Sequence, residues 1–191
     1  MIGVLAIQGD YMAHASILAQ LKENYCLIVS AEQLNKCDGL IIPGGESPTI
    51  LNIILQNGLF EAIKKFHTQG KPIFGTCAGA ILSAKKVINP EQKSLGLVDV
   101  IIKRNAYGRQ LQSHIVMGKN LLNNQPQEMV LIRAPKITQL GANVKVLATY
   151  EEDAVVVLEN NCLLTTFHPE LSPDLFWHKY FLETMCKRQA K

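Results

Sequence analysis

The sequence of 191 residues is poor in the features that mark secreted, metal-binding or membrane proteins. Its five cysteines are odd in number and widely scattered, and they form no CxxC pair and no Cys/His spacing typical of a metal site. This pattern argues against a disulfide framework or a bound metal and favours a reducing, intracellular setting. No apolar run reaches the length of a membrane span, and no basic leader with a cleavage site opens the chain, so we expect a cytoplasmic protein.

An excess of charge of one sign is also missing. The formal net charge is +3, which is too small to indicate binding to nucleic acid or to a membrane surface. The hydrophobic fraction of 48% is ordinary for a globular protein. The length allows one sizeable hydrophobic core, and we expect residues 1–191 to form a single domain.

The most informative segment that is present is Gly-Thr-Cys-Ala-Gly at residues 75–79. An apolar strand precedes it, and small residues that suit a helix start follow it. The pattern Gly-x-Cys-x-Gly is the cysteine version of a nucleophile elbow, a sharp turn that exposes one reactive side chain and crowds its neighbours. Cys77 would then lie at a helix N-terminus, where free N–H groups favour the thiolate. Taken alone, the motif also fits a buried core cysteine beside two loop glycines.

A second motif, His-Pro-Glu at residues 168–170, ends an apolar strand near the C-terminus. Residues two apart on an extended segment point to the same side, so His168 and Glu170 can face one another. The carboxylate would orient the imidazole, as the third member of a catalytic triad does. A solvated pair at a strand end is the alternative for this motif alone, but its combination with the cysteine elbow favours catalysis.

A third motif, Pro-Gly-Gly-Glu-Ser-Pro at residues 43–48, is another strand-to-helix turn. Ser47 suits the N-cap of the helix, and Pro48 suits its first position. The turn can present backbone N–H groups at the sheet edge, where an acyl-transfer nucleophile needs two donors for its oxyanion. We expect these donors to be the N–H groups of Gly45 and Ala78. An ordinary strand-to-helix loop is the alternative interpretation.

Apolar strands alternate with helices in the first half of the chain. The expected strands are residues 2–8, 25–30, 38–43 and 72–75, and the expected helices are residues 11–23, 48–56, 59–69 and a helix from the elbow to about residue 86. Continuous apolar strands between helices indicate a parallel sheet that is covered on both faces.

The pattern changes after Pro90. Strand-like segments follow at residues 97–103, 128–133, 145–149, 154–159 and 162–167, and a closing helix is expected at residues 173–187. We therefore expect an α/β fold, with a doubly wound, mostly parallel sheet, helices on both faces and an antiparallel addition. The candidate site would lie at the carboxyl ends of the strands, as is usual for such sheets.

Six segments together carry a family resemblance. They are Gly-Val-Leu-Ala-Ile-Gln-Gly-Asp at 3–10, Pro-Gly-Gly-Glu-Ser at 43–47, Gly-Thr-Cys-Ala-Gly at 75–79, Arg-Asn-Ala-Tyr-Gly-Arg-Gln at 104–110, Ile-Arg-Ala-Pro at 132–135 and His-Pro-Glu-Leu at 168–171. In order and spacing they resemble the class I, triad-type glutamine amidotransferases. The fourth and fifth segments narrow the resemblance to the glutaminase subunits of pyridoxal 5′-phosphate synthase. The resemblance covers nearly the whole chain.

The resemblance implies a Cys-His-Glu triad, with Cys77 as the nucleophile, His168 as the general base and Glu170 as its orienting partner. It also implies a glutamine site, which is lined by Gly45, Glu46, Ser47, Arg104, Ile132 and Arg133. An arginine fork suits the α-carboxylate of the substrate, but the sequence does not say which arginine holds it.

Two other interpretations concern residues near these motifs. A basic patch that is solvated or faces a partner is the alternative for Arg104 and Arg109. Pro48 stands where the family usually has a threonine, and His114 stands where it usually has an aromatic residue.

The implied activity is hydrolysis of L-glutamine to L-glutamate and ammonia through a cysteine thioester. The resemblance implies that ammonia passes to a separate synthase subunit that makes pyridoxal 5′-phosphate, and that no cofactor or metal is needed. Gln8, Asp10 and His14 are the candidates for the contact with that partner, which could set the Gly44–Gly45 turn, and ordinary helix capping is the alternative for Asp10. The alternatives are a cysteine hydrolase of the same architecture that acts on another amide or ester, and a binding subunit without activity.

Overall fold

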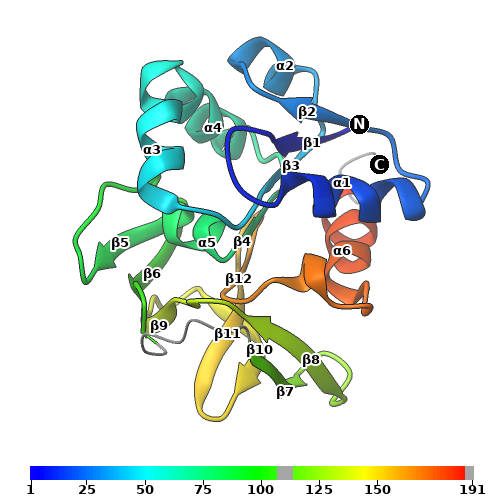
Figure 1. Cartoon of the computed structure of the whole chain (residues 1–191), viewed down its shortest axis with the longest axis vertical. Coiled ribbons are helices and arrows are strands. Elements are labelled where there is room, and N and C mark those ends of the chain that lie inside the picture. Colours follow the sequence, from blue (N-terminus) through cyan, green and yellow to red (C-terminus); the bar gives the residue numbers. More distant parts are fainter. Residues whose placement is uncertain (107–113, 188–191) are drawn as a thin grey trace.

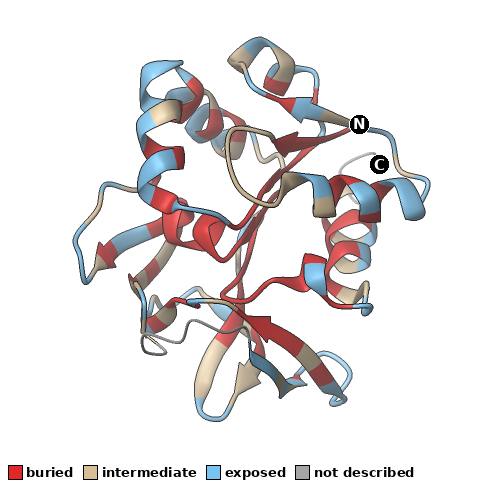
Figure 2. Ribbon diagram, in the orientation of Figure 1, coloured by how far each residue is buried: buried red, intermediate tan, exposed pale blue. Residues whose placement is uncertain are grey.

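Short apolar segments form the parallel half of the main sheet in the computed structural model, which describes residues 1–106 and 114–187. The nine strands of this sheet follow the order β2-β1-β3-β4-β12-β11-β10-β7-β8 (Figure 1). Its parallel strands are β1 (Ile2–Leu5), β2 (Tyr25–Ile28), β3 (Gly39–Ile42), β4 (Ile73–Thr76) and β12 (Cys162–Thr165). All of them except the edge strand β2 are buried along their whole length, as expected for strands with helices on both faces (Figure 2).

The antiparallel addition continues the same sheet beyond β12. It consists of β11 (Asp153–Glu159), β10 (Lys145–Tyr150), β7 (His114–Asn120) and β8 (Pro126–Leu131). A second, smaller sheet contains β5 (Ala84–Ile88), β6 (Val98–Lys103) and β9 (Lys136–Leu140). The expected fold class, a mostly parallel α/β sheet with an antiparallel addition, is therefore confirmed.

Helices cover both faces of the parallel strands (Figure 1). They are α1 (Tyr11–Gln20), α2 (Ala31–Asn35), α3 (Ser47–Gln56), α4 (Leu59–Thr68), α5 (Ala78–Ser83) and α6 (Phe176–Tyr180), which continues as a π-helix over Phe181–Cys186. A short 3₁₀ helix, Pro169–Leu171, follows β12.

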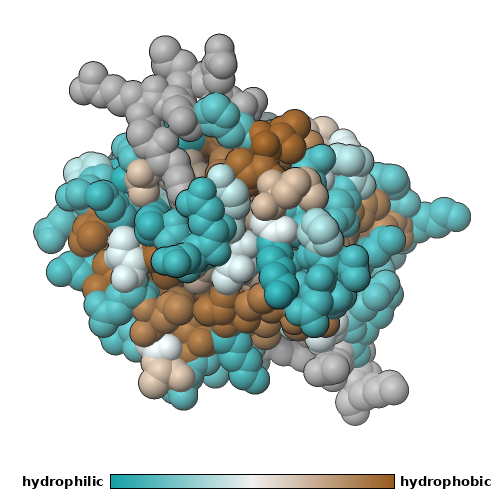
Figure 3. Space-filling model, turned by 90° about the horizontal axis from the view of Figure 1, so that it is seen from below, coloured by the Kyte–Doolittle hydropathy of each residue, from teal (hydrophilic) through white to brown (hydrophobic). Residues whose placement is uncertain are grey.

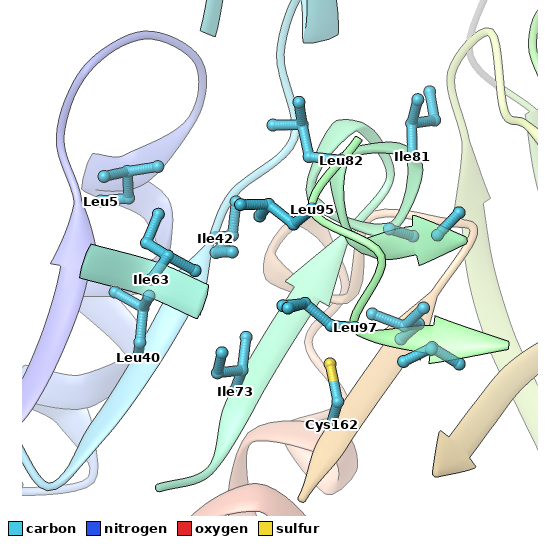
Figure 4. Packing of buried hydrophobic residues seen from close by; sticks show 14 of the residues in the cluster. Leu5, Leu40, Ile42, Ile63, Ile73, Ile81, Leu82, Leu95, Leu97 and Cys162 are labelled. Atoms are coloured by element: carbon cyan, nitrogen blue, oxygen red, sulfur yellow. The ribbon is translucent and has the colours of Figure 1, made fainter. Parts of the chain in front are cut away.

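The side chains of the strands alternate between two hydrophobic clusters, because successive residues of a strand point to opposite faces. In β4, Ile73 packs with the helices α3, α4 and α5, while Phe74 packs with Trp177 and Phe181 on the other face. Figure 4 shows part of the first cluster, which contains Leu40, Ile42 and Ile73 of the strands together with Ile63 of α4 and Leu82 of α5. The strands that carry the three sequence motifs are thus fixed from both sides.

Two parts of the expected secondary structure are wrong. The helix after the elbow ends at Ser83, and the residues expected to continue it to about residue 86 form β5, which pairs with β6. Ala84 and Val87 are buried there, so pairing and burial outweigh the helix propensity of the segment. The strands β7 and β9 and the short helix α2 were also not expected, although Ser30 and Gln33 form a capping box at the start of α2 that the sequence does show.

Apolar side chains also lie on the surface at the antiparallel end of the molecule. Ile115 and Met117 of β7 are 67% and 60% exposed. Seen from below, this end of the molecule carries a band of hydrophobic side chains between hydrophilic ones (Figure 3).

The helix α5 is pressed against β3 through a glycine, and this contact gives a first prediction. A Cβ atom at Gly79 would lie 2.9 Å from the carbonyl carbon of Ile42, which is a backbone atom and cannot turn aside. Gly79→Ala should therefore lower the free energy of unfolding by about 3 kcal/mol, the upper range for overpacking. Ala80→Gly in the same helix is the control and should cost about 1 kcal/mol. Urea unfolding measures both, and an equal loss in the two variants would contradict the close contact.

Candidate active site

The expected sharp turn between β4 and α5 is present and is strained. Cys77 has φ 45° and ψ −98°, a conformation that a non-glycine residue adopts only where the surrounding structure enforces it. Its N–H donates to the carbonyl oxygen of Thr165 on the neighbouring strand β12, at 2.9 Å. The Sγ atom lies 3.9 Å from the carbonyl oxygen of Ile132. Because the turn is tied to the neighbouring strand, the thiol is held at the carboxyl end of β4.

His168 and Glu170 face one another across the end of β12. Nδ1 of His168 is 2.8 Å from Oε1 of Glu170, and the side chain of Glu170 is fully buried. The N–H of His168 donates to the carbonyl oxygen of Val130 on β8, at 2.9 Å, which ties this segment to the antiparallel strands. The expected geometry of an oriented imidazole is therefore present, and the pair is buried rather than solvated.

The charged form of His168 is favoured by its neighbours. Burial alone lowers the pKa of an imidazole, but hydrogen bonds and charge interactions with Cys77 and Glu170 outweigh burial and raise the pKa of His168 to about 10. The imidazole thus interacts with the thiol on one side and with the carboxylate on the other. This environment can stabilise a thiolate–imidazolium pair, which is the reactive form of a cysteine nucleophile.

The Gly44–Gly45 turn is held by the loop that follows β1. The N–H of Asp10 donates to the carbonyl oxygen of Gly44 at 3.1 Å, and the N–H of Glu46 donates to Oε1 of Gln8 at 2.8 Å. In a trans peptide the C=O and N–H groups point in opposite directions. The N–H of Gly45 therefore points away from the loop, on the side of the cavity described below.

Glycine is required at both positions of this turn. A Cβ atom at residue 44 would lie 2.9 Å from Nδ1 of His168, so the turn approaches the imidazole more closely than any side chain allows. Gly45 has φ 154° and faces the side chain of Gln8, which a Cβ atom would meet at 2.6 Å. The turn, the imidazole and the loop after β1 thus form one packed unit.

A cavity of about 430 Å³ opens over the thiol. It brings together parts of all the sequence motifs, and its lining residues are Gln8, Gly45, Glu46, Ser47, Cys77, Ile81, Arg104, Asn105, Ile132, Arg133 and His168. Arg133 Nη1 is 3.5 Å from Glu46 Oε1, and both side chains are about 60% exposed at the cavity. The cavity therefore contains a cation and an anion beside a nucleophile, a set of groups that is complementary to an amino acid.

Nearly every sequence-predicted site residue lies in this cavity or directly behind it. Two of the predicted residues do not line the cavity: Glu170 is buried behind His168, and Ala78 is buried in the first turn of α5. Arg109 lies outside the described residues. Ser47 is not the N-cap that we expected, because α3 begins at Ser47 itself and its hydroxyl donates to Oε1 of Gln92 at 3.0 Å.

Sequence reasoning missed several residues of the site. Ile81 lines the cavity one helical turn after the nucleophile, a spacing that the sequence does show. Asn105 lines it beside Arg104. His14 was expected at a partner-facing surface, but it is wholly buried under the site, as is His178 on α6. The short sequence around either histidine contains no signal for this burial.

Two further observations concern the described part of the chain, residues 1–106 and 114–187. It contains no group of three or more His, Cys, Asp or Glu side chains that could hold a metal ion. None of its helices has both the length and the apolar composition that a membrane span needs.

Comparison with known protein families agrees with this geometry. The model of the SNO glutamine amidotransferase family matches residues 4–187, which include every site residue named above. The chain belongs to this family. The expected resemblance to glutamine amidotransferases is therefore confirmed, and the chain is a member of an enzyme family.

Curated relatives match along almost the whole chain. A protein from Thermotoga petrophila named "Pyridoxal 5'-phosphate synthase subunit PdxT" is 45% identical over 183 residues, which are 95% of this chain and 97% of the relative. A protein of the same name from Koribacter versatilis is 47% identical over 182 residues, with coverage of 95% and 94%.

Solved structures agree at the level of the fold. The crystal structure of a glutamine amidotransferase superposes with a TM-score of 0.90 at 38% identity and covers 95% of this chain and 97% of its own. PurLQS from Thermotoga maritima superposes with a TM-score of 0.73 at 15% identity, and it covers 100% of this chain and 98% of its own. At that identity, the second comparison supports the fold alone.

The buried histidines behind the site give a prediction about acid stability. Burial lowers the pKa of His14 and lowers that of His178 to about 4. In the unfolded chain both histidines bind a proton near pH 6.5, so between about pH 6.5 and pH 4 the unfolded state binds more protons. The free energy of unfolding should therefore fall as the pH falls through this window. His178→Gln removes one such group and should reduce this slope by up to about 1.4 kcal/mol per pH unit.

Urea unfolding at a series of pH values measures this slope. His114→Gln is the matched control, because His114 lies exposed on β7. If His178→Gln kept the full slope of the wild type, the conclusion that His178 is neutral in the folded protein would be wrong.

Proposed function

We propose that this chain is the glutaminase subunit of a pyridoxal 5′-phosphate synthase, hydrolysing L-glutamine to L-glutamate and ammonia for a separate synthase subunit. The observation that carries the proposal is the arrangement over the 430 Å³ cavity, where Cys77 at a strained elbow interacts with His168, which a buried Glu170 orients. The names of the curated relatives support the choice of synthase over other amide-hydrolysing systems.

In the first half of the reaction, the Cys77 thiolate attacks the side-chain amide carbon of glutamine, and the amide oxygen becomes an oxyanion. The N–H groups of Gly45 and Ala78 are the proposed donors to that oxyanion, which is the charge that such sites stabilise most. The imidazolium of His168 then gives its proton to the leaving nitrogen as the carbon–nitrogen bond breaks. Ammonia leaves, and a γ-glutamyl thioester remains on Cys77.

In the second half, water hydrolyses the thioester. Neutral His168 takes a proton from the water molecule that attacks the thioester carbon, and the same N–H groups hold the second oxyanion. Collapse of this intermediate releases glutamate and regenerates the thiolate beside imidazolium. Glu170 remains a carboxylate in both halves and keeps Nδ1 of the imidazole directed toward itself.

The walls of the cavity suit the amino-acid end of glutamine. Glu46 can accept hydrogen bonds from the α-ammonium group, and Arg133 or Arg104 can hold the α-carboxylate with a guanidinium fork. Ser47 and Ile132 line the cavity between these charges and the thiol. We propose these residues, with Gly45, as the glutamine site.

Two broader statements belong to the same proposal. We propose that residues 1–191 act as one domain, because β11 and β12 from the C-terminal half pair within the same sheet as the N-terminal strands. We also propose that the protein acts in the cytoplasm, where its five free cysteines would stay reduced.

Substitutions in the triad test the proposed function. With the synthase subunit present, His168→Asn should lower kcat for glutamine by at least about a thousandfold, because both proton transfers depend on this imidazole. Glu170→Gln should cost less, on the order of tenfold to a hundredfold, because it orients the base without exchanging protons with the substrate. Glutamate release measures both. Turnover of a simple ester that is faster than that of glutamine would favour the alternative, a cysteine hydrolase with another substrate.

The synthase subunit should also regulate the reaction. A glycine peptide can flip at low steric cost, and a flip of the Gly44–Gly45 peptide would remove the Gly45 donor, a loss of roughly 3 kcal/mol or about a hundredfold in rate. We propose that the free chain exchanges between the flipped turn and the turn described above, and that the synthase subunit holds the latter, so kcat for glutamine should rise when the subunit binds. Gln8→Ala removes the acceptor for the Glu46 N–H and should lower the rate in the complex by roughly tenfold, the value of one lost hydrogen bond.

Asp10→Lys tests the contact with the partner without disturbing the turn. The backbone N–H of residue 10 still donates to Gly44, while the charge of the side chain beside the turn is reversed. It should raise the concentration of synthase subunit needed for half-maximal activity. An isolated chain that already works at full speed, without any response to the synthase subunit, would refute this regulation and leave the hydrolytic chemistry intact.

A further inference from the structure

Two histidines that the mechanism above does not use lie directly behind the triad. His14 on α1 and His178 on α6 are wholly buried, and Nδ1 of His14 is 2.9 Å from Nε2 of His178. The other nitrogen of His14, Nε2, is 3.2 Å from Oγ1 of Thr76 and 3.4 Å from Oε2 of Glu170. Thr76 is the residue before the nucleophile. The histidine pair therefore reaches both the strand that carries Cys77 and the carboxylate that orients His168.

The second oxygen of the Glu170 carboxylate needs this neighbour. Oε1 bonds to His168, but Oε2 is buried and has no hydrogen-bond partner within normal distance among the residues that the structure describes. A buried carboxylate oxygen without any donor is costly. The Nε2 atom of His14, at 3.4 Å, is placed to supply a donor. Hydrogen bonds of catalytic groups are often long in the free enzyme and shorten in the working complex.

One arrangement of protons satisfies this chain of groups best. If His178 carries its proton on Nε2, it donates to Nδ1 of His14, and His14 then carries its own proton on Nε2, between Oγ1 of Thr76 and Oε2 of Glu170. Nδ1 of His178, which is buried without a partner in the described structure, is then a lone pair. The opposite arrangement would leave a buried N–H on His178 without an acceptor and would direct a lone pair of His14 at the carboxylate. Both rings are neutral in the first arrangement, in agreement with the lowered pKa of each.

We propose that His14 and His178 are positioning residues of the active site: His178 fixes the tautomer of His14, and the Nε2–H of His14 holds the second oxygen of Glu170. Glu170 is thereby fixed by His168 on one side and by His14 on the other, so its carboxylate cannot rotate away from the base. Neither histidine touches the substrate, and both act through Glu170. The inference rests on the proposed function only in that its kinetic readout is glutamine turnover.

A matched pair of substitutions at residue 14 tests the proposal. The amide nitrogen of glutamine can occupy the place of Nε2, so His14→Gln keeps a donor toward Glu170. The amide of asparagine reaches only the place of Nδ1, so His14→Asn keeps a polar group toward His178 and withdraws that donor. Both substitutions replace the imidazole ring with a polar amide, so the loss of ring packing affects both variants. Phe181→Leu is the control for a general loss of packing, because Phe181 packs on Phe74, the ring that also contacts His14 and His178.

The assay measures kcat and KM for glutamine with the synthase subunit at saturation. His14→Asn should lower kcat by about tenfold or more with KM changed less than about twofold, while His14→Gln should stay within about threefold of wild type. A second readout does not depend on turnover. In protein labelled with ¹⁵N-histidine, the deshielded Nδ1–H signal of His168 should be lost or shifted upfield in His14→Asn and retained in His14→Gln and Phe181→Leu.

Several results would overturn the proposal. Equal kcat values and equal His168 signals in His14→Asn and His14→Gln would show that a donor to Glu170 is not the function of this side chain. An equal loss of kcat in Phe181→Leu would assign the effect to packing. If the wild type did not hydrolyse glutamine at all, the proposed function would fail, and the His168 signal would still decide whether His14 positions Glu170.

Discussion

Removing a carboxylate from water is among the least favourable steps in folding, and it is tolerated only where donors and opposite charge surround the group. The side chain of Glu170 is fully buried, and its partners come from different parts of the chain, His168 beside it and His14 on α1. Because Glu170 requires these partners, the segment after β12, the helix α1 and the end of β4 must come together at one place. Interactions with Cys77 and with this buried carboxylate together raise the pKa of His168.

The fold places the rest of the site around that charge at the carboxyl ends of β1, β3, β4 and β12. Each of these strands contributes through the turn that follows it: the Gln8 loop, the Gly44–Gly45 turn, the Cys77 elbow and the His168 segment. The contacts between these turns are mostly backbone hydrogen bonds and close approaches that only glycine allows. Two charged side chains, Glu46 beside the Gly44–Gly45 turn and Arg133 after β8, are exposed at the cavity.

The parallel half of the sheet and the sharp turn at Cys77 could be predicted from the sequence because local signals encode them. Strands of continuous apolar residues, and glycines two residues on either side of Cys77, are visible without any tertiary information. The strand β5 was not predictable in this way, since its segment has good helix propensity and becomes a strand only by pairing with β6. The position of His14 was also hidden, because its burial depends on α6, which is more than 150 residues away in the sequence. The start of α3 was displaced by one residue from the expected position, because the Ser47 hydroxyl donates to Gln92 and does not cap the helix.

The central claim is that Cys77 carries the glutamyl group during turnover, and trapping that intermediate tests it most directly. The chain and its synthase subunit are mixed with glutamine, quenched in acid during steady turnover, digested and analysed by mass spectrometry. The account predicts a γ-glutamyl group on the peptide that contains Cys77, on none of the other four cysteine-containing sites, and its absence in Cys77→Ala. Continued glutamate release by Cys77→Ala, or a glutamyl group on a different cysteine, would contradict the account.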